Sequence, residues 1–166
     1  MSIIVRPYKH PDDFESVGEF LIKTYQIEGQ HRNWCQPRWE YMHYHPSLDE
    51  SSLDRIGIWE DRGAIVGVVH PDLEMREVYF EIGPDYSYLR KDVLEYAQKH
   101  LYRDLDQRRL LEVYINETDH EFEAIAEDLG FQKDKNRKED MSRLKIAHPF
   151  PCINCPGGIC TEKSTR

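Results

Sequence analysis

Long hydrophobic runs are missing from this chain of 166 residues. No apolar stretch approaches the roughly 20 residues that a membrane-spanning helix needs, and residues 1–7 do not have the layout of a signal peptide. Positive charge is scarce as well, because 22 Lys and Arg face 31 Asp and Glu, which gives a formal net charge of -9. Nucleic-acid-binding proteins normally carry a basic patch. The sequence therefore predicts a cytoplasmic protein that binds neither membranes nor nucleic acids.

Cysteine is rare, and three of the four cysteines lie close together near the end of the sequence. Cys152 and Cys155 have the short spacing of many structural zinc sites, and Cys160 and His148 complete a set of four candidate ligands. This pattern supports one hypothesis, a small zinc-binding or redox protein. The same segment is rich in proline and glycine, which is typical of a linker or tail. Reduced thiols or a metal fit this usage better than a disulfide scaffold.

The remaining composition is that of one globular domain. Hydrophobic residues make up 39% of the chain and charged residues 32%, and a chain of this length can enclose a proper core. We expect a folded domain over residues 1–147 and a tail rich in Pro, Gly and Cys over residues 148–166.

Hydrophobic periodicity predicts both helices and strands. Helices are expected at residues 14–25, 37–45, 86–101 and 118–129, the last with Thr118 and Glu121 as a capping box and Gly130 as its stop. Strands are expected at residues 3–6, 55–60, 64–69, 77–82, 110–115 (in a central position) and 142–146, and a loop at residues 47–54. The fold class is therefore α/β, with a mixed, mostly antiparallel sheet, flanking helices and one parallel β-α-β crossover.

This order of elements, together with the residues at its junctions, resembles the GNAT acetyltransferase family over residues 3–146. Residues 34–46 and 149–151 also resemble the degenerate N-terminal half of two-domain GNAT-like proteins from bacteria. The resemblance implies the GNAT-like acyl-CoA N-acyltransferase fold. The segments that carry it are Arg6-Pro7 with Asp12-Asp13, the hairpin of residues 58–69, Ile82-x-Pro84-x-Tyr86 and Leu129-Gly130-Phe131.

The resemblance also implies that acetyl-CoA binds in the turn after the fourth strand. GNAT proteins typically have Gln/Arg-x-x-Gly-x-Gly/Ala there, and its backbone N–H groups hold the pyrophosphate. Both glycines are lost here, so Arg90 and Lys91 can compensate only by charge, while Asp92 repels the phosphates. The cofactor-binding residues implied are Phe80, Ile82, Ser87, Tyr88, Leu89, Arg90, Lys91, Asp92 and Asp119.

Acetyl transfer to an amine needs a base for the ammonium proton and a proton donor for the leaving thiolate. Glu81 and Glu77 alternate with apolar residues along the strand at 77–82 and are the candidate bases. The alternative for these two residues is a strand face that is solvated or salt-bridged to a helix. Ala126 stands where the family often has a proton-donating tyrosine, and Tyr114 is the candidate substitute.

Aromatic and histidine side chains are concentrated between residues 31 and 45. They are predicted either to line a pocket for a cationic acceptor or to pack a helix onto the core. The cluster consists of His31, Trp34, Trp39, Tyr41, His43, Tyr44 and His45.

Two functions remain open besides the zinc hypothesis. The first is an N-acetyltransferase that moves an acetyl group from acetyl-CoA to an amine of a small molecule or peptide, with a degraded pyrophosphate loop. The second is a catalytically silent GNAT-like module that acts as an interaction or regulatory domain. Either one is compatible with a homodimer or with a second GNAT-like domain as partner.

Overall fold

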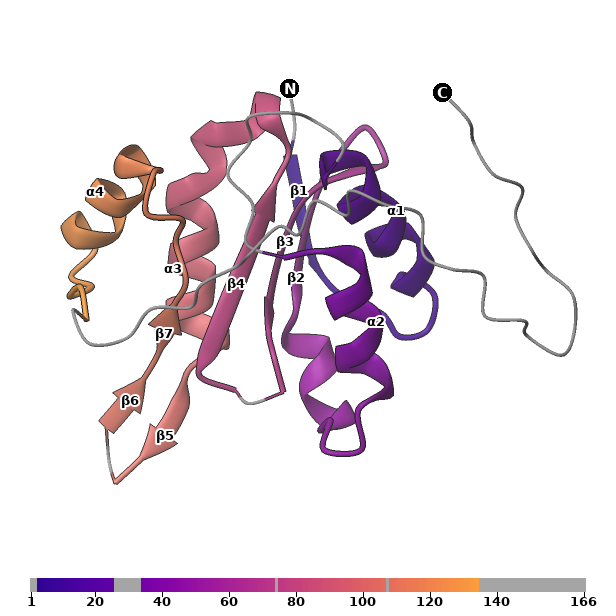
Figure 1. Ribbon diagram of the computed structural model, residues 1–166, viewed down its shortest axis with the longest axis horizontal. Helices are drawn as coiled ribbons and strands as arrows, with labels where there is room; N and C mark the ends of the chain where they lie inside the picture. Colours follow the sequence, from indigo (N-terminus) through magenta and orange to yellow (C-terminus); the bar gives the residue numbers. More distant parts are fainter. Residues whose placement is uncertain (1–2, 26–33, 74, 107, 135–166) are drawn as a thin grey trace, which may run out of the picture. The chain divides into compact units, whose positions relative to one another are not determined.

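The computed structural model describes residues 3–25, 34–73, 75–106 and 108–134 (Figure 1). The chain divides into two compact units, Met1–Lys133 and Asp134–Arg166, and the described residues belong almost entirely to the first. The predicted strand at 142–146, the boundary at 147 and the cysteine-rich tail lie outside the described residues.

Five strands form one mixed sheet in the order β1-β2-β3-β4-β7 (Figure 1). Neighbours run antiparallel except β4 and β7, which are parallel and are joined through α3 (Arg90–His100). The predicted fold class is therefore confirmed, including its single parallel crossover. The strands are β1 (Ile3–Pro7), β2 (Gly57–Asp61), β3 (Ala64–Pro71), β4 (Glu77–Ile82) and β7 (Glu112–Val113).

Helices cover both faces of the sheet. One hydrophobic core lies between the sheet and α1 (Phe14–Tyr25) with α2 (Gln36–Tyr44), and a second lies under α3 and α4 (His120–Asp128) (Figure 1). Trp34 and Trp39 are exposed by only 1% and 0% in the first core. Core packing is thus confirmed for these two tryptophans, while His31 of the same sequence cluster lies outside the described residues.

The two faces of β4 point into different cores because side chains alternate along a strand. Val78 and Phe80 belong to the core under α3 and α4, and Tyr79 belongs to the core under α1 and α2. Glu81 lies on the same face as Tyr79 and is exposed by only 2%. The alternative of a solvated strand face is therefore wrong at Glu81, whose carboxylate is buried and accepts a hydrogen bond from the N–H of Trp34.

The turn after β4 differs from the prediction. A 3-10 helix, η2 (Pro84–Leu89), follows β4, and α3 begins only at Arg90 instead of at residue 86. Tyr86 has φ −118° and ψ 21°, outside the helical region. Its hydroxyl donates to Asp61 at 2.9 Å, which ties this turn to the end of β2.

The start of α4 also differs from the prediction. A carboxylate oxygen of Asp119 accepts a hydrogen bond from the N–H of Phe122 at 3.2 Å, so Asp119 is the N-cap. The hydroxyl of Thr118 donates instead to Asn116 at 2.8 Å, and the predicted capping box is wrong. Gly130 has φ +91°, as the predicted helix stop requires.

Short elements account for the other differences. The predicted loop at 47–54 contains a 3-10 helix, η1 (Glu50–Arg55). A two-stranded hairpin of β5 (Arg103–Leu105) and β6 (Arg108–Leu110) precedes β7 and was not predicted. The strand predicted at 110–115 is reduced to the two residues of β7, and among the described strands it ends the order instead of lying centrally.

Candidate functional site

The parallel strands β4 and β7 pair only over two residues, Glu77 with Glu112 and Val78 with Val113. The hydrogen bond from the N–H of Tyr114 to the carbonyl of Val78, at 3.1 Å, is the last backbone bond between them among the described residues. We call the region beyond this bond, from Phe80 to Ile82, the β4–β7 fork. In the part of the chain that the structure describes, no strand pairs with this edge of β4 beyond that bond, so the fork leaves the edge open there.

The direction of the backbone groups in the fork follows from the antiparallel pairing of β4 with β3. Asp72 donates to the carbonyl of Glu77 at 3.1 Å, and Gly83 donates to the carbonyl of Val66 at 2.8 Å. Hydrogen-bonded positions alternate along such a ladder. The odd-numbered residues of β4 therefore bond to β3, and the N–H and C=O groups of Phe80 and Ile82 face the fork.

The side of the fork toward α3 and α4 is apolar. Phe80 is exposed by 3%, and its ring meets that of Phe122 edge to face with centroids 5.4 Å apart. Leu89, at the end of η2, is exposed by 2%. Of the predicted cofactor-binding residues, the structure thus places Phe80, Ile82 and Leu89 on or near the fork.

The polar residues predicted around the pyrophosphate are held by ion pairs. Arg90 contacts a carboxylate oxygen of Asp119 at 2.8 Å and one of Glu121 at 2.6 Å. The start of α3 is thereby tied to the start of α4, and two predicted cofactor residues neutralise each other. Lys91 lies 3.6 Å from Glu95 on the exposed side of α3. The exposed predicted residues are Ser87, Tyr88, Lys91 and Asp92.

Glu81 lies on the other side of the sheet, against the segment that leads into α2. The backbone N–H of Trp34 donates to its carboxylate at 2.8 Å. Two residues earlier on the same face, the ring of Tyr79 stacks on Tyr114 with centroids 4.7 Å apart and planes 5° apart. On this face, Tyr79 thus has Glu81 two residues further along β4 and the ring of Tyr114 stacked on its own ring.

Arg38 of α2 packs on the same group of residues. Its guanidinium lies 4.3 Å from the ring centroid of Trp34 and 5.0 Å from that of Tyr79. It also contacts Asp72 at 3.1 Å. Such cation–π contacts stabilise a charged side chain on aromatic rings. The sequence did not single out Arg38, because an arginine in a polar helix carries no distinguishing signal.

Glu77 lies apart from the fork. It stands at the start of β4, where the strand pairs with β7, and contacts Arg76 at 3.4 Å. Its side chain is about a quarter exposed. The partner of Glu77 in this ion pair is the residue directly before β4, which lies in a turn and not in a helix. The two candidate bases are not brought together.

His70 of β3 is a buried titratable group that the sequence did not reveal. Burial among Trp34, Trp39 and Tyr79 lowers its pKa to about 3. The ring is therefore neutral, its Nδ1 donates to the carbonyl of Pro71 at 2.8 Å, and its Nε2 has no hydrogen-bond partner. A single histidine inside an apolar strand gives no sequence signal that separates it from the core.

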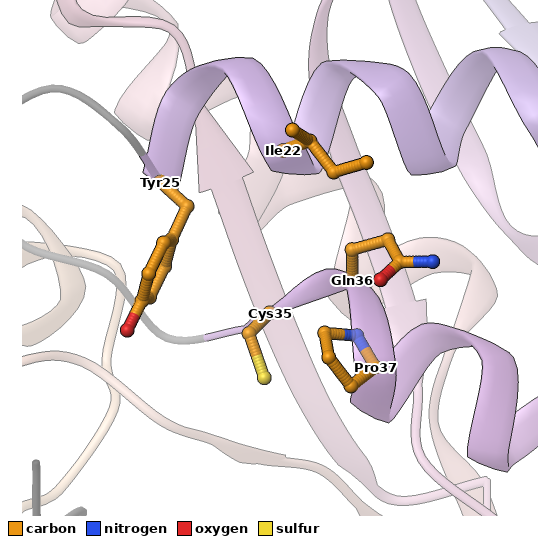
Figure 2. A pocket seen from close by; sticks show the side chains of 5 residues that line it. All are labelled: Ile22, Tyr25, Cys35, Gln36 and Pro37. Carbon is orange, nitrogen blue, oxygen red and sulfur yellow. The ribbon is translucent and has the colours of Figure 1, made fainter. Parts of the chain in front are cut away.

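A hollow of about 300 Å³ lies between the end of α1 and the start of α2. The side chains that line it are drawn in Figure 2. The hollow is lined by Ile22, Tyr25, Cys35, Gln36 and Pro37. Cys35 is a free, half-buried thiol. Among the described residues, its lining holds no carboxylate, histidine or lysine side chain.

The described residues hold neither a cluster of metal ligands nor a membrane-spanning helix. Within 3–25, 34–73, 75–106 and 108–134, no group of three or more His, Cys, Asp or Glu is placed to hold a metal ion. The predicted zinc ligands, His148, Cys152, Cys155 and Cys160, lie outside these ranges. In the same part of the chain, no helix has the length and apolar character needed to cross a membrane.

No protein-family model and no curated protein matches the chain. Among solved structures, it is similar to a GNAT-family acetyltransferase from Streptococcus pneumoniae (15% identity, TM-score 0.48, 78% of this chain and 84% of that chain). It is also similar to a ribosomal-protein-alanine N-acetyltransferase from Brucella melitensis biovar Abortus 2308 (13% identity, TM-score 0.45, 86% of this chain and 100% of that chain). A third similar structure is that of a possible acetyltransferase from Clostridium difficile 630 (14% identity, TM-score 0.46, 89% of this chain and 100% of that chain). At identities this low, function has to be inferred from the site itself.

Proposed function

We propose that this chain binds acetyl-CoA at the β4–β7 fork and transfers the acetyl group to an amine of a small molecule or peptide. The observation that carries the proposal is the end of the β4–β7 ladder at Val78, after which Phe80 and Ile82 turn their backbone groups into the fork. An extended ligand with amide groups, such as the arm of CoA, bonds to an open strand edge as a further strand would.

The chemistry follows from the groups beside the fork. The amine nitrogen attacks the thioester carbon, the carbon–sulfur bond breaks, and the sulfur leaves with the bonding electron pair. A backbone N–H of the fork donates to the carbonyl oxygen as negative charge develops there. Glu81 takes the proton of the attacking amine, and Tyr114 donates a proton to the leaving thiolate.

The pyrophosphate of the cofactor would lie at the turn between β4 and α3. Arg90 is the nearest strong cation in the predicted set, but Asp119 and Glu121 already hold it. A phosphate must compete with these two carboxylates, and both glycines of the typical motif are missing, which prevents close backbone approach. Gly83 of this turn lies before the motif, and its N–H already donates to the carbonyl of Val66. We therefore expect acetyl-CoA to bind more weakly than it does to a glycine-containing loop.

Replacing Glu81 with glutamine tests the assigned base. Thermal shift should show that wild type and Glu81→Gln bind acetyl-CoA equally, since the glutamate takes no part in holding the cofactor. The rate of CoA release with an amine acceptor should fall at least about 100-fold, because general-base catalysis contributes 10²–10⁴-fold. Glu77→Gln is the matched control, and it should keep both binding and rate. A full rate in Glu81→Gln would remove Glu81 from the mechanism.

A second candidate is the catalytically silent module. Two observations favour it: Arg90 is committed to two carboxylates, and Glu81 is buried with a hydrogen bond from Trp34. A folded chain that binds no acetyl-CoA at millimolar concentration would establish this alternative against the enzyme.

A further inference from the structure

The strand β1 lies at one edge of the sheet, with β2 as its neighbour among the described strands. Its side chains Ile4 and Val5 are 56% and 47% exposed. Exposed edge strands with apolar branched side chains are templates for pairing with another chain, and proteins usually protect them with charges or prolines. Two features decide what pairs with this edge: the direction of its backbone groups and its charge.

The pairing of β1 with β2 fixes which backbone groups point outward. The N–H of Tyr8 donates to the carbonyl of Ile56 at 2.9 Å, and the same register pairs Arg6 with Ile58 and Ile4 with Glu60. Because hydrogen-bonded positions alternate, Ile4 and Arg6 bond to β2. The N–H and C=O groups of Ile3 and Val5 therefore point away from the sheet.

Charge does not protect this edge. Arg6 is the charged residue of β1, and its guanidinium contacts Asp13 and Glu60, each at 2.6 Å. Both carboxylates hold it over the sheet and neutralise it. Pro7 lacks an N–H group and protects only the end of the strand, beyond Val5.

We propose that two copies of this chain associate through antiparallel pairing of their β1 strands about a two-fold axis at Ile4. Ile3 of each copy then faces Val5 of the other, and each of these two pairs exchanges two hydrogen bonds. The two Ile4 side chains meet across the axis. A second copy is the occupant because this edge is complementary to itself, which is the requirement for a closed two-fold dimer. The inference is independent of the proposed acetyl transfer.

The expected association is weak. Five residues from each copy bury less than the roughly 1,200 Å² that stable interfaces need. The dissociation constant should therefore be on the order of 10–100 μM. Sedimentation equilibrium from about 1 to 500 μM covers this range.

Val5→Pro is the decisive variant, because it removes an N–H that points outward and takes no part in the bonding of β1 to β2. Wild type should shift from monomer to dimer with concentration, and Val5→Pro should stay monomeric. Val5→Thr keeps the N–H and the branched side chain and should dimerise like wild type. Far-UV circular dichroism checks the fold of each variant.

Ile4→Lys provides a second test that does not depend on a proline. It places two ammonium groups across the axis at an exposed position, and the dissociation constant should rise at least about tenfold. A wild-type protein that is monomeric at 500 μM, or variants Val5→Pro and Ile4→Lys that dimerise as strongly as wild type, would overturn the proposal.

Discussion

Replacing Trp39 with alanine is expected to lower the free energy of unfolding by about 3–5 kcal/mol, which is the range for large aromatic side chains in cores. Trp39 is fully buried, and its ring lies against Tyr8 and His43 with centroids 5.4 and 4.1 Å away. Its indole N–H also donates to the carbonyl of Phe14 at 3.2 Å. The alanine variant loses the packing of α2 against α1 and the sheet and leaves that carbonyl without its donor.

Urea unfolding followed by circular dichroism measures this loss without relying on tryptophan fluorescence. Tyr44→Ala is the control on the same helix, since Tyr44 is 78% exposed and should change the unfolding free energy by less than about 0.5 kcal/mol. A loss below about 1 kcal/mol in Trp39→Ala would show that α2 is not packed as described.

Acidification is expected to destabilise the protein through His70. Its pKa is about 3 in the folded protein, against 6.5 for an ordinary histidine. Below pH 6.5 the unfolded chain binds a proton that the folded protein does not, so stability is full above pH 6.5 and falls as the pH falls toward 3. Each pH unit inside this window costs about 1.4 kcal/mol. From pH 6.5 to 5 the expected loss is therefore about 2 kcal/mol.

The pH dependence of unfolding in variants isolates this contribution from other groups. Burial also lowers the pKa of His43, which acts in the same direction. His70→Asn should flatten the slope between pH 6.5 and 5, whatever its effect on stability at pH 7. His120→Asn, with a side chain that is 82% exposed, should keep the wild-type slope. Equal slopes in wild type and His70→Asn would show that His70 is not buried and neutral.

Periodicity in the sequence was sufficient to predict the helices and strands that have one consistently apolar face. Val17 and Leu21 recur on one side of α1, and both are buried. The alternation of Val78 and Phe80 located β4, whose bounds in the structure are those predicted. These elements obey local rules because each has one face toward a core.

Contacts between distant residues were beyond the reach of sequence patterns. Glu81 alternates as a surface residue does, yet Trp34 donates to it across 47 positions of sequence. Thr118 and Asp119 are both residue types that cap helices well. In the structure the cap is Asp119, which also forms an ion pair with Arg90 of α3. The three-residue strands β5 and β6 are too short to show a period.

The β4–β7 fork likewise could not be derived from periodicity. The sequence of residues 110–115 is apolar enough for a long strand, but in the structure β7 pairs with β4 over only two residues. Strand propensity alone does not fix where such pairing stops, because it depends on the surrounding structure. The proposed cofactor site depends on this point, since it determines that β7 does not pair with Phe80 and Ile82.

Calorimetric titration of acetyl-CoA into wild type and Ile82→Pro tests the proposed site most directly. The N–H of Ile82 faces the fork and takes no part in the bonding of β4 to β3, so proline removes a donor to the ligand and leaves that ladder intact. Ile82→Val keeps the donor and serves as the control. Wild type and Ile82→Val should bind one acetyl-CoA with similar affinity, and Ile82→Pro should bind about tenfold more weakly. Absence of binding at millimolar acetyl-CoA, or equal affinity in all three proteins, would contradict acetyl-CoA binding at the fork.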